Sequence, residues 1–291
     1  MIPVNTHLAV LESHLILLNS PLRTRVSYLS SLKKYLEFCN SKNMEDAFTD
    51  DAVKQFLLYR YSQNLDWKTI NLDYSAIKKY LVGVLQKEWN VQMYPRPKAN
   101  TELPNIISKE EVQKLIENVR MVKYKAFFIF LYATGMRISE ALAVKVKDIN
   151  SDRLQIKVEK GKGHKDRYID VPMTLIEILR EYYIIYKPSD NLFYGKNKHD
   201  VISERNIQYA MKRAKEKAGI IHEISPHTLR HCYATHHMEN GSNIVYIQKM
   251  LGHRSIKTTS IYLHLCVNFQ SKTIVHPMTL IILSLRNNSQ I

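Results

Sequence analysis

The feature that most constrains the fold is a proline-bearing segment one third of the way along the chain. Residues 94–104 read YPRPKANTELP, with three prolines and few apolar side chains. Proline has no amide donor and disfavours helix at the residue before it, so this segment is expected to be stiff and extended. A capping-box pattern, SKEE at 108–111, then begins a new helix. With 291 residues in all, the chain is predicted to form two domains, 1–93 and 108–291, joined by a linker at 94–107.

The first domain is predicted to be a small bundle of four or five helices without strands. Thr49 is placed to cap a helix over 50–62, and two aspartates stand in its first turn. A further apolar pattern over 67–85 alternates with lysines, which are expected to form a solvated face: Lys68, Lys78 and Lys79. The segment 20–39 has apolar residues spaced for one buried helix face: Val26, Leu29, Leu32, Leu36 and Phe38.

The second domain is predicted to be mainly helical with one β interlude. Residues 153–172 read RLQIKVEKGKGHKDRYIDVP, in which two apolar stretches flank a glycine-bounded turn at 161–165. This pattern indicates a basic hairpin whose tip can enter a groove or touch a phosphate. Helical patterns resume over 173–186, over 203–219 and through the region that ends at Tyr262. The fold class is therefore mainly α with a small β-sheet or hairpin.

The charge of the chain favours a polyanionic partner. Lys and Arg total 42 against 27 Asp and Glu, a formal net charge of +15. Both parts are positive, since residues 1–100 carry 13 basic and 9 acidic side chains. Each neutralised phosphate releases counterions, so nucleic acid is the expected partner. A basic protein with no such partner, or one drawn to an anionic membrane surface, remains the alternative.

The cysteines and the apolar runs bear on the compartment. Cys39, Cys232 and Cys266 are odd in number and widely spaced, which fits neither a disulfide framework nor a metal-binding pair and suggests a reducing cytosol. The N-terminal segment MIPVNTHLAVLESHLILL lacks the basic start of a signal peptide. No apolar run reaches the length of a membrane span. A cytoplasmic protein with no membrane partner is expected.

The residues that carry chemistry lie in SPHTLRHCYATHHMENGSNIVYIQKMLGHRSIKTTSIY, which spans 225–262. Phosphodiester cleavage needs a nucleophile, charge stabilisation on the nonbridging oxygens and a proton for the leaving oxygen. Arginine suits the second task because its planar fork binds phosphate and stays charged. Imidazole suits proton transfer beside an anion. These side chains suit attack of a tyrosine hydroxyl on a phosphodiester without a metal: His227, Arg230, His253 and Tyr262, preceded by Arg137 in ATGMRISEAL.

Each residue taken alone also has an ordinary structural interpretation. Arg137 could be a surface or salt-bridging arginine, and among 18 tyrosines Tyr233 and Tyr246 are rival nucleophiles. His227 and His231 have i,i+4 spacing that could suggest zinc, but the metalloprotease pattern needs Glu where Thr228 stands. Neither a metal nor another cofactor is therefore expected.

The joint order of TGMRISEAL, GKGHKDR, SPHTLRHCYATH, LGH and Tyr262 closely resembles the tyrosine recombinase (phage integrase, Xer-like) family. The resemblance covers the whole second domain and implies an α+β catalytic domain there. The first domain is similar, with weaker signatures, to the SAM-like helical core-binding domain of the family. By this resemblance Tyr262 is the nucleophile that forms a 3′-phosphotyrosyl bond. The other implied roles are phosphate clamping by Arg137 and Arg230, general acid by Lys162, acceptance of the tyrosine proton by His227, phosphate hydrogen bonding by His253 and support of the arginine by Glu140.

The implied function is site-specific recombination or integration of double-stranded DNA, independent of metal and ATP, by a homo-oligomer that is a tetramer on DNA. Two alternatives are kept. A type IB topoisomerase-like enzyme would relax DNA by similar chemistry, and a non-catalytic DNA-binding protein would keep only the fold. One departure from the family is the tail after Leu265, CVNFQSKTIVHPMTLIILSLRNNSQI, which has a hydrophobic patch and little helix-friendly charge. In the family this segment commonly packs on a neighbouring protomer, so the mode of assembly stays open.

Overall fold

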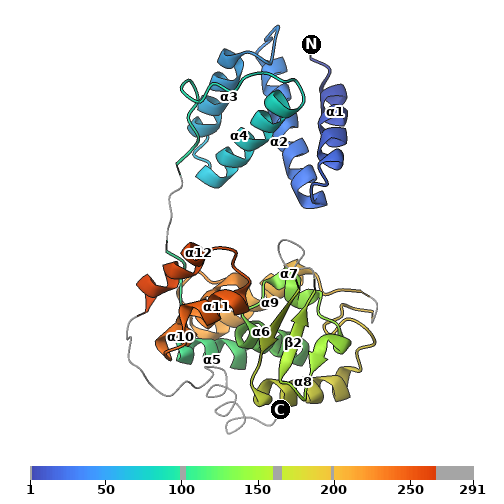
Figure 1. The fold of residues 1–291 in the computed structure, drawn as a ribbon, viewed down its shortest axis with the longest axis vertical. Coiled ribbons are helices and arrows are strands. Elements are labelled where there is room, and N and C mark those ends of the chain that lie inside the picture. Colours follow the sequence, from blue (N-terminus) through green and yellow to red (C-terminus); the bar gives the residue numbers. More distant parts are fainter. Residues whose placement is uncertain (1, 99–102, 160–165, 198–199, 267–291) are drawn as a thin grey trace. The chain divides into compact units, whose positions relative to one another are not determined.

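A computed structural model describes residues 2–98, 103–159, 166–197 and 200–266. The chain divides into two compact units, Met1–Glu102 and Leu103–Ile291 (Figure 1). The division lies within the linker that the prolines predict. None of the described helices is both long enough and apolar enough to cross a membrane.

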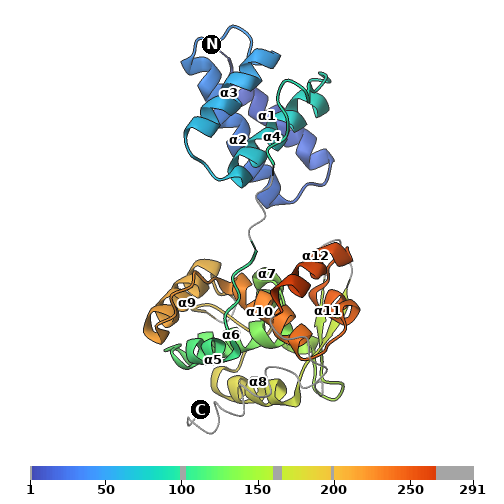
Figure 2. The same ribbon diagram turned by 90° about the vertical axis from the view of Figure 1, so that its left-hand side faces the viewer.

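The first unit is a bundle of helices, as its apolar periodicity predicts (Figure 2). Thr49 caps α3 as expected, because its side chain accepts a hydrogen bond from the Ala52 amide. α2 packs mainly on α4 and α1. Lys68 and Lys78 are exposed and Lys79 is half-buried, which agrees with a solvated face. The helices are α1 (Val4–Leu17), α2 (Leu22–Ser41), α3 (Asp50–Ser62) and α4 (Trp67–Gly83).

One expected core residue of the first unit is wrong. Leu32, Leu36 and Phe38 are buried in α2 as predicted, but Val26 is 59 % exposed. Between Leu22 and Ser30 no residue of the helix is fully buried, and Tyr28 and Leu29 pack only partly buried against the core. Periodicity identifies the apolar face of a helix, but it does not tell how many turns of that face are covered.

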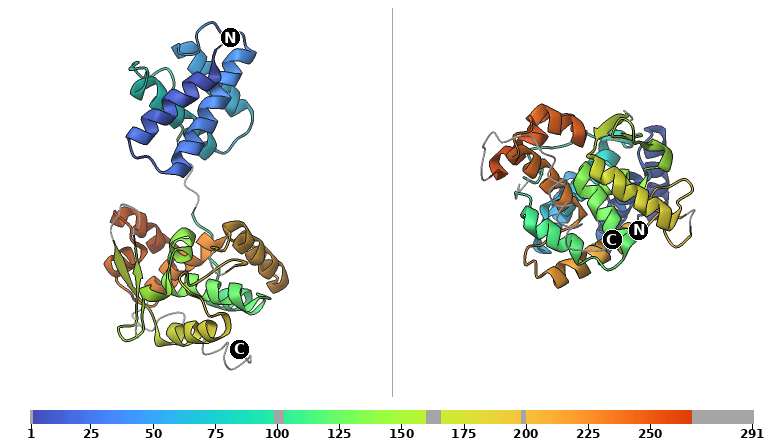
Figure 3. Two further views of the ribbon diagram at one scale, coloured as in Figure 1. Left: turned by 90° about the vertical axis from the view of Figure 1, so that its right-hand side faces the viewer. Right: turned by 90° about the horizontal axis from the view of Figure 1, so that it is seen from below.

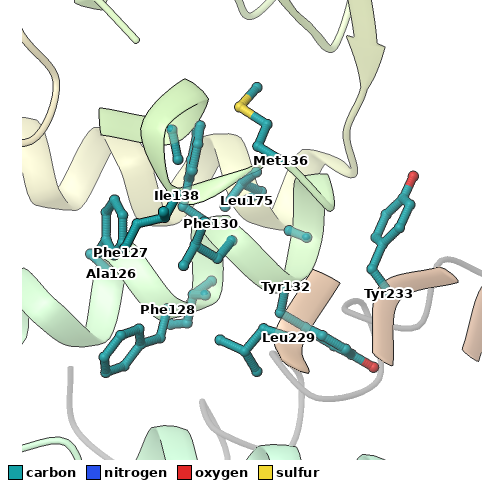
Figure 4. Close-up of a cluster of buried hydrophobic side chains, with 14 of the residues drawn as sticks. Ala126, Phe127, Phe128, Phe130, Tyr132, Met136, Ile138, Leu175, Leu229 and Tyr233 are labelled. Carbon is teal, nitrogen blue, oxygen red and sulfur yellow. The ribbon is translucent and has the colours of Figure 1, made fainter. Parts of the chain in front are cut away.

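The second unit is built around one buried helix, α6 (Val122–Thr134). Every residue of α6 from Ala126 onward is buried. Figure 4 shows its aromatic side chains in one buried cluster with Leu175 of α8 and Leu229 of α10. The other helices are α5 (Lys109–Glu117), α7 (Ile138–Leu142), α8 (Met173–Tyr186), α9 (Glu204–Ala218), α10 (Pro226–Glu239), α11 (Ile244–Leu251) and α12 (Ile256–Ser260), with 3-10 helices η1 (Val146–Asp148) and η2 (Ile261–Leu265).

Local capping explains where several of these helices begin. The Ser108 hydroxyl accepts from the Glu111 amide, and the Glu111 carboxylate accepts from the Ser108 amide, so the predicted capping box starts α5. Pro226 occupies the first position of α10, where its missing amide costs nothing. Pro226 thereby sets the start of the helix that carries His227 and Arg230.

A three-stranded antiparallel sheet supplies the β interlude. β1 (Ile149–Asn150) pairs with β2 (Gln155–Val158), and β2 pairs with β3 (Arg167–Asp170). Ile156 faces Ile169 across β2 and β3, and both are buried. β3 contacts α11 beside it (Figure 3). The predicted strands are therefore present and β1 is an addition, while the turn at 160–165 lies outside the described residues.

Candidate active site

Arg137 stands at the start of α7, immediately after a turn that only glycine fits. Gly135 ends α6 with φ 60°, and a Cβ there would lie 2.5 Å from the ring of Tyr233. Arg137 then occupies the N-cap of α7. Its side chain is 26 % exposed, which is more than the other guanidiniums of the site.

Glu140 is the anion around which three guanidiniums gather. Its carboxylate accepts from Arg137 Nη1 at 2.8 Å and from Arg167 Nη2 at 2.8 Å. Arg230 Nη1 lies 4.0 Å away. Burial alone would raise the pKa of Glu140, but the hydrogen bonds and charges of Arg167 and Arg137 lower it to about 2. Glu140 is thus ionised at neutral pH and touches the arginines, as its predicted supporting role requires.

Arg230 is held from α10 by backbone carbonyls of two other segments. Nη1 donates to the Gly135 carbonyl at 2.7 Å, and Nη2 donates to the Leu251 carbonyl at 2.8 Å. Burial and the nearby charge of Arg137 lower its pKa to about 10. The guanidinium therefore remains charged at neutral pH in a largely desolvated position, where its attraction for an anion is strong.

His253 follows the C-terminus of α11, where Gly252 adopts φ 66° and caps the helix. Its Nε2 lies 3.0 Å from Arg230 Nη2. A guanidinium can only donate, so Nε2 accepts and the ring proton is on Nδ1, which donates to Thr259 Oγ1 at 2.9 Å. Burial, followed by the charges of Arg230 and Arg137, lowers the pKa of His253 to about 4. The ring is therefore neutral at pH 7.

Tyr262 lies on η2, directly after α12, and is 2 % exposed. Its ring stacks on His253 with centroids 6.5 Å apart and an interplanar angle of 10°. Burial raises the pKa of the phenol, whereas the charges of Arg230 and Arg137 act in the opposite direction. The hydroxyl is therefore within the electrostatic reach of both arginines.

The Tyr262 hydroxyl is hydrogen-bonded to His231, at 2.9 Å from Nδ1. Burial, followed by the charges of Arg230 and His227, lowers the pKa of His231 to about 4. Its neutral ring can accept the phenolic proton. Sequence reasoning weighed His231 only as a zinc ligand. A usable signal was its position directly after Arg230 and one turn beyond His227 on the same face.

The remaining predicted residues are placed differently. His227 keeps solvent contact in the first turn of α10, but partial desolvation by neighbouring atoms, followed by the charges of Arg230 and Arg137, lowers its pKa. Lys162 lies outside the described residues. Tyr233, a rival nucleophile, is 1 % exposed with its ring against Gly135. For Tyr246, the other rival, burial and a hydrogen bond to Asp170 raise the pKa to about 12.

The described part of the chain offers no metal centre, since nowhere in it do three His, Cys, Asp or Glu side chains gather as ligands. His227 and His231 share a helix face without a third ligand. The site is instead a set of guanidiniums, neutral imidazoles and one phenol. Such a set can bind a phosphate, shield its charge and move protons around it.

Comparison with known proteins agrees with this chemistry. Residues 105–268 match the phage integrase family, and residues 11–91 match the phage integrase N-terminal SAM-like domain. The putative integrase/recombinase y4qK of Sinorhizobium fredii is 32 % identical over 252 residues, which cover 86 % of this chain and 81 % of that protein. The tyrosine recombinase XerA of Thermococcus kodakarensis is 31 % identical over 84 % of this chain and 86 % of its own.

A solved structure also shares the fold. The XerH site-specific recombinase, bound to its palindromic difH substrate after cleavage, superposes with a TM-score of 0.69 at 23 % identity. The match covers 86 % of this chain and 78 % of that one. The mainly helical two-part fold and the family expected from the sequence motifs are thereby confirmed. The chain belongs to the phage integrase family of tyrosine recombinases.

Proposed function

We propose that this protein is a site-specific DNA recombinase that cleaves and rejoins strands through Tyr262. The observation that carries the proposal is the meeting of four side chains from four separate segments of the second unit. Arg137 begins α7, Arg230 comes from α10, His253 follows α11, and Tyr262 lies on η2. Each has a partner or an electrostatic influence that ties it to Arg230.

In the proposed reaction, the Tyr262 Oη attacks the scissile phosphorus. A bond forms between Oη and phosphorus while the bond from phosphorus to the 5′-oxygen breaks, which leaves a 3′-phosphotyrosyl link and a free 5′-hydroxyl. The phosphodiester bond energy is kept in that link, so resealing needs no ATP. Attack of another 5′-hydroxyl on the same link runs the reaction backwards and exchanges strands.

The two arginines would clamp the nonbridging oxygens. Arg137 is the more exposed and would reach the phosphate from the surface. Arg230 is held by the Gly135 and Leu251 carbonyls and would supply its charge from the buried side of the site. Fixed donors of this kind stabilise the transition state without reorganisation. His253 would donate to an oxygen once its Nε2 is protonated.

The proton of Tyr262 would pass to an imidazole. The family resemblance gives this role to His227, but the hydrogen bond of the hydroxyl to His231 supports His231 as the first acceptor. A bound phosphate would offset the arginine charges and raise the pKa of both rings, which makes them better bases. The leaving 5′-oxygen would take its proton from Lys162, as the resemblance implies.

DNA is the proposed partner of both units. The first unit has a groove of about 350 Å³ beside α2 and α4, and three of the side chains that line it are basic: Lys78, Lys79 and Arg96. Together with the net charge of +15, it supports phosphate contacts by this unit as a core-binding domain. Strand exchange between two sites would take a tetramer of protomers, and a cytoplasmic location is part of the proposal.

A type IB topoisomerase would use similar chemistry, so the decisive test is whether partners are exchanged. The wild-type protein is used to capture its site covalently from a randomised pool of nicked duplexes. The captured site is then placed on a supercoiled circle and on a linear fragment. Recombination predicts joint molecules of circle and fragment. A change of linking number without joint molecules would support the topoisomerase, and the absence of any captured DNA would overturn both.

A further inference from the structure

We propose that Arg167 is a positioning residue. By pairing with the Glu140 carboxylate, it leaves the positive charges of Arg137 and Arg230 available to the phosphate. This inference rests on the proposed function and adds a residue to the same site. Arg167 is the first residue of β3, and its side chain is 11 % exposed. It is the last residue of the GKGHKDR segment, but none of the roles that the family resemblance implies falls on it.

The first support is the pairing of Arg167 with Glu140. Arg167 Nη1 lies 3.2 Å from Oε1 and Nη2 lies 2.8 Å from Oε2, a two-point contact between the planar groups. The Arg137 guanidinium meets the carboxylate through Nη1 alone, while the Arg137 backbone amide donates to Oε2 at 3.0 Å. Arg230 Nη1 stays 4.0 Å away. Arg167 is therefore the principal guanidinium partner of Glu140.

The second support is what Arg167 does with its remaining donor. Its Nε donates to the Met250 carbonyl at 3.0 Å, next to the Leu251 carbonyl that Arg230 holds at 2.8 Å. Two guanidiniums, one from β3 and one from α10, thus secure consecutive carbonyls at the end of α11. His253 follows this helix end after Gly252, so Arg167 also holds the backbone that precedes His253.

The third support is the close approach at Gly252. A Cβ on Gly252 would lie 3.0 Å from both Cζ and Nη1 of Arg167. Glycine at this helix cap therefore provides both the positive φ of 66° and the space through which the guanidinium reaches Glu140.

These contacts define what the residue contributes. Three guanidiniums face one carboxylate, so the cluster keeps a net positive charge for the phosphate. If Arg167 were absent, Glu140 would turn to Arg137 and Arg230, and it would compete with the phosphate for both. Glu140 anchors the clamp when Arg167 is present and becomes its inhibitor when Arg167 is removed.

The test is a double-mutant cycle on single-turnover cleavage of the captured nicked duplex, with Arg167→Met, Arg167→Lys, Glu140→Gln and Arg167→Met/Glu140→Gln. We expect Arg167→Met to slow cleavage at least tenfold, measured at a temperature where circular dichroism shows the variant to be fully folded. In the Glu140→Gln background the same change should slow cleavage less than threefold, because no anion is left to compete. Equal losses in both backgrounds would overturn the proposal.

A matched pair of glycines tests the geometry independently. Gly252→Ala and Gly219→Ala impose the same backbone strain, since both glycines cap helices with φ of 66° and 67°, but a Cβ on Gly219 meets nothing within 4 Å. Gly252→Ala should slow cleavage at least tenfold and Gly219→Ala less than twofold. Equal effects would contradict the role of the close approach.

A measurement that needs no activity separates this inference from the proposed function. The Glu140 carboxyl is titrated by carbon-detected NMR in wild type and in Arg167→Met, where Arg137 and Arg230 still face it. The pKa should rise from about 2 when Arg167 is removed. An unchanged pKa would overturn the role of Arg167, whereas wild-type protein that cleaves no DNA would overturn the proposed function instead.

Discussion

The phenolic oxygen of Tyr262 lies 2.9 Å from Nδ1 of His231, in a site where the neutral imidazole can accept its proton. His231 belongs to the same helix as Arg230, so α10 carries both the arginine proposed to bind the phosphate and the histidine that contacts the proposed nucleophile. The hydroxyl is buried as well as bonded. Entry of DNA therefore has to displace or use this hydrogen bond before Tyr262 can react.

Replacing His231 by Ala is expected to slow formation of the covalent adduct about 10²-fold at pH 7, because general-base assistance is worth about that much. DNA affinity in a gel shift should be unchanged. His264→Ala is the matched control, since His264 is exposed on the same 3-10 helix as Tyr262. Wild-type rates for His231→Ala alongside a large loss for His227→Ala would assign the proton to His227.

Arg230 is expected to matter for stability as well as for activity. Arg230→Ala leaves the buried Gly135 and Leu251 carbonyls without their donor, which should lower the free energy of unfolding by about 2 kcal/mol. Arg230→Lys keeps the charge but cannot bridge both carbonyls, so a smaller loss is expected. Urea unfolding measures both, and an Arg230→Ala protein as stable as wild type would contradict the described contacts.

His253 is expected to be neutral in the free protein with its proton on Nδ1. Arg230 donates to Nε2 and the Nδ1 proton goes to Thr259, so the tautomer is fixed from both sides. Nitrogen chemical shifts of the labelled ring should show this tautomer at pH 7 and protonation only near the lowered pKa of about 4. A ring protonated on Nε2 in the free protein would show that the contact with Arg230 is absent in solution.

Buried histidines should make the second unit sensitive to acid. His236 is hydrogen-bonded to Tyr132, and burial is the main cause that lowers its pKa to about 4. In the unfolded chain His236 has an ordinary pKa near 6.5, so between pH 7 and pH 5 it binds a proton that it does not bind in the folded chain. The free energy of unfolding therefore decreases as the pH is lowered over this range. Over this range His236→Gln should lose about 2 kcal/mol less unfolding free energy than wild type. Equal losses would mean that His236 is protonated in the folded state.

Much of the fold follows from local sequence signals. The caps at Thr49 and Ser108 act within a few residues, so both helix starts were predictable from spacing. The exposure of Val26 in α2 was not predictable from spacing, because it depends on where the neighbouring helices end.

The candidate site shows the same division. Arg137, Arg230, His253 and Tyr262 were identified by their order along the chain, and their placement together required the fold. Arg167 could not be found from spacing, since its partners Glu140 and Met250 are 27 and 83 residues away. Long-range polar contacts of this kind leave no periodic trace in a sequence.

The central claim is that Tyr262 is the nucleophile, and covalent trapping tests it most directly. Wild type and Tyr262→Phe are incubated with the captured duplex nicked beside the cleavage position, so that the cleaved fragment is lost and the intermediate accumulates. A denaturing gel should show a protein–DNA adduct for wild type and none for Tyr262→Phe, with equal binding of both to the intact duplex. An adduct formed by Tyr262→Phe would contradict the assignment.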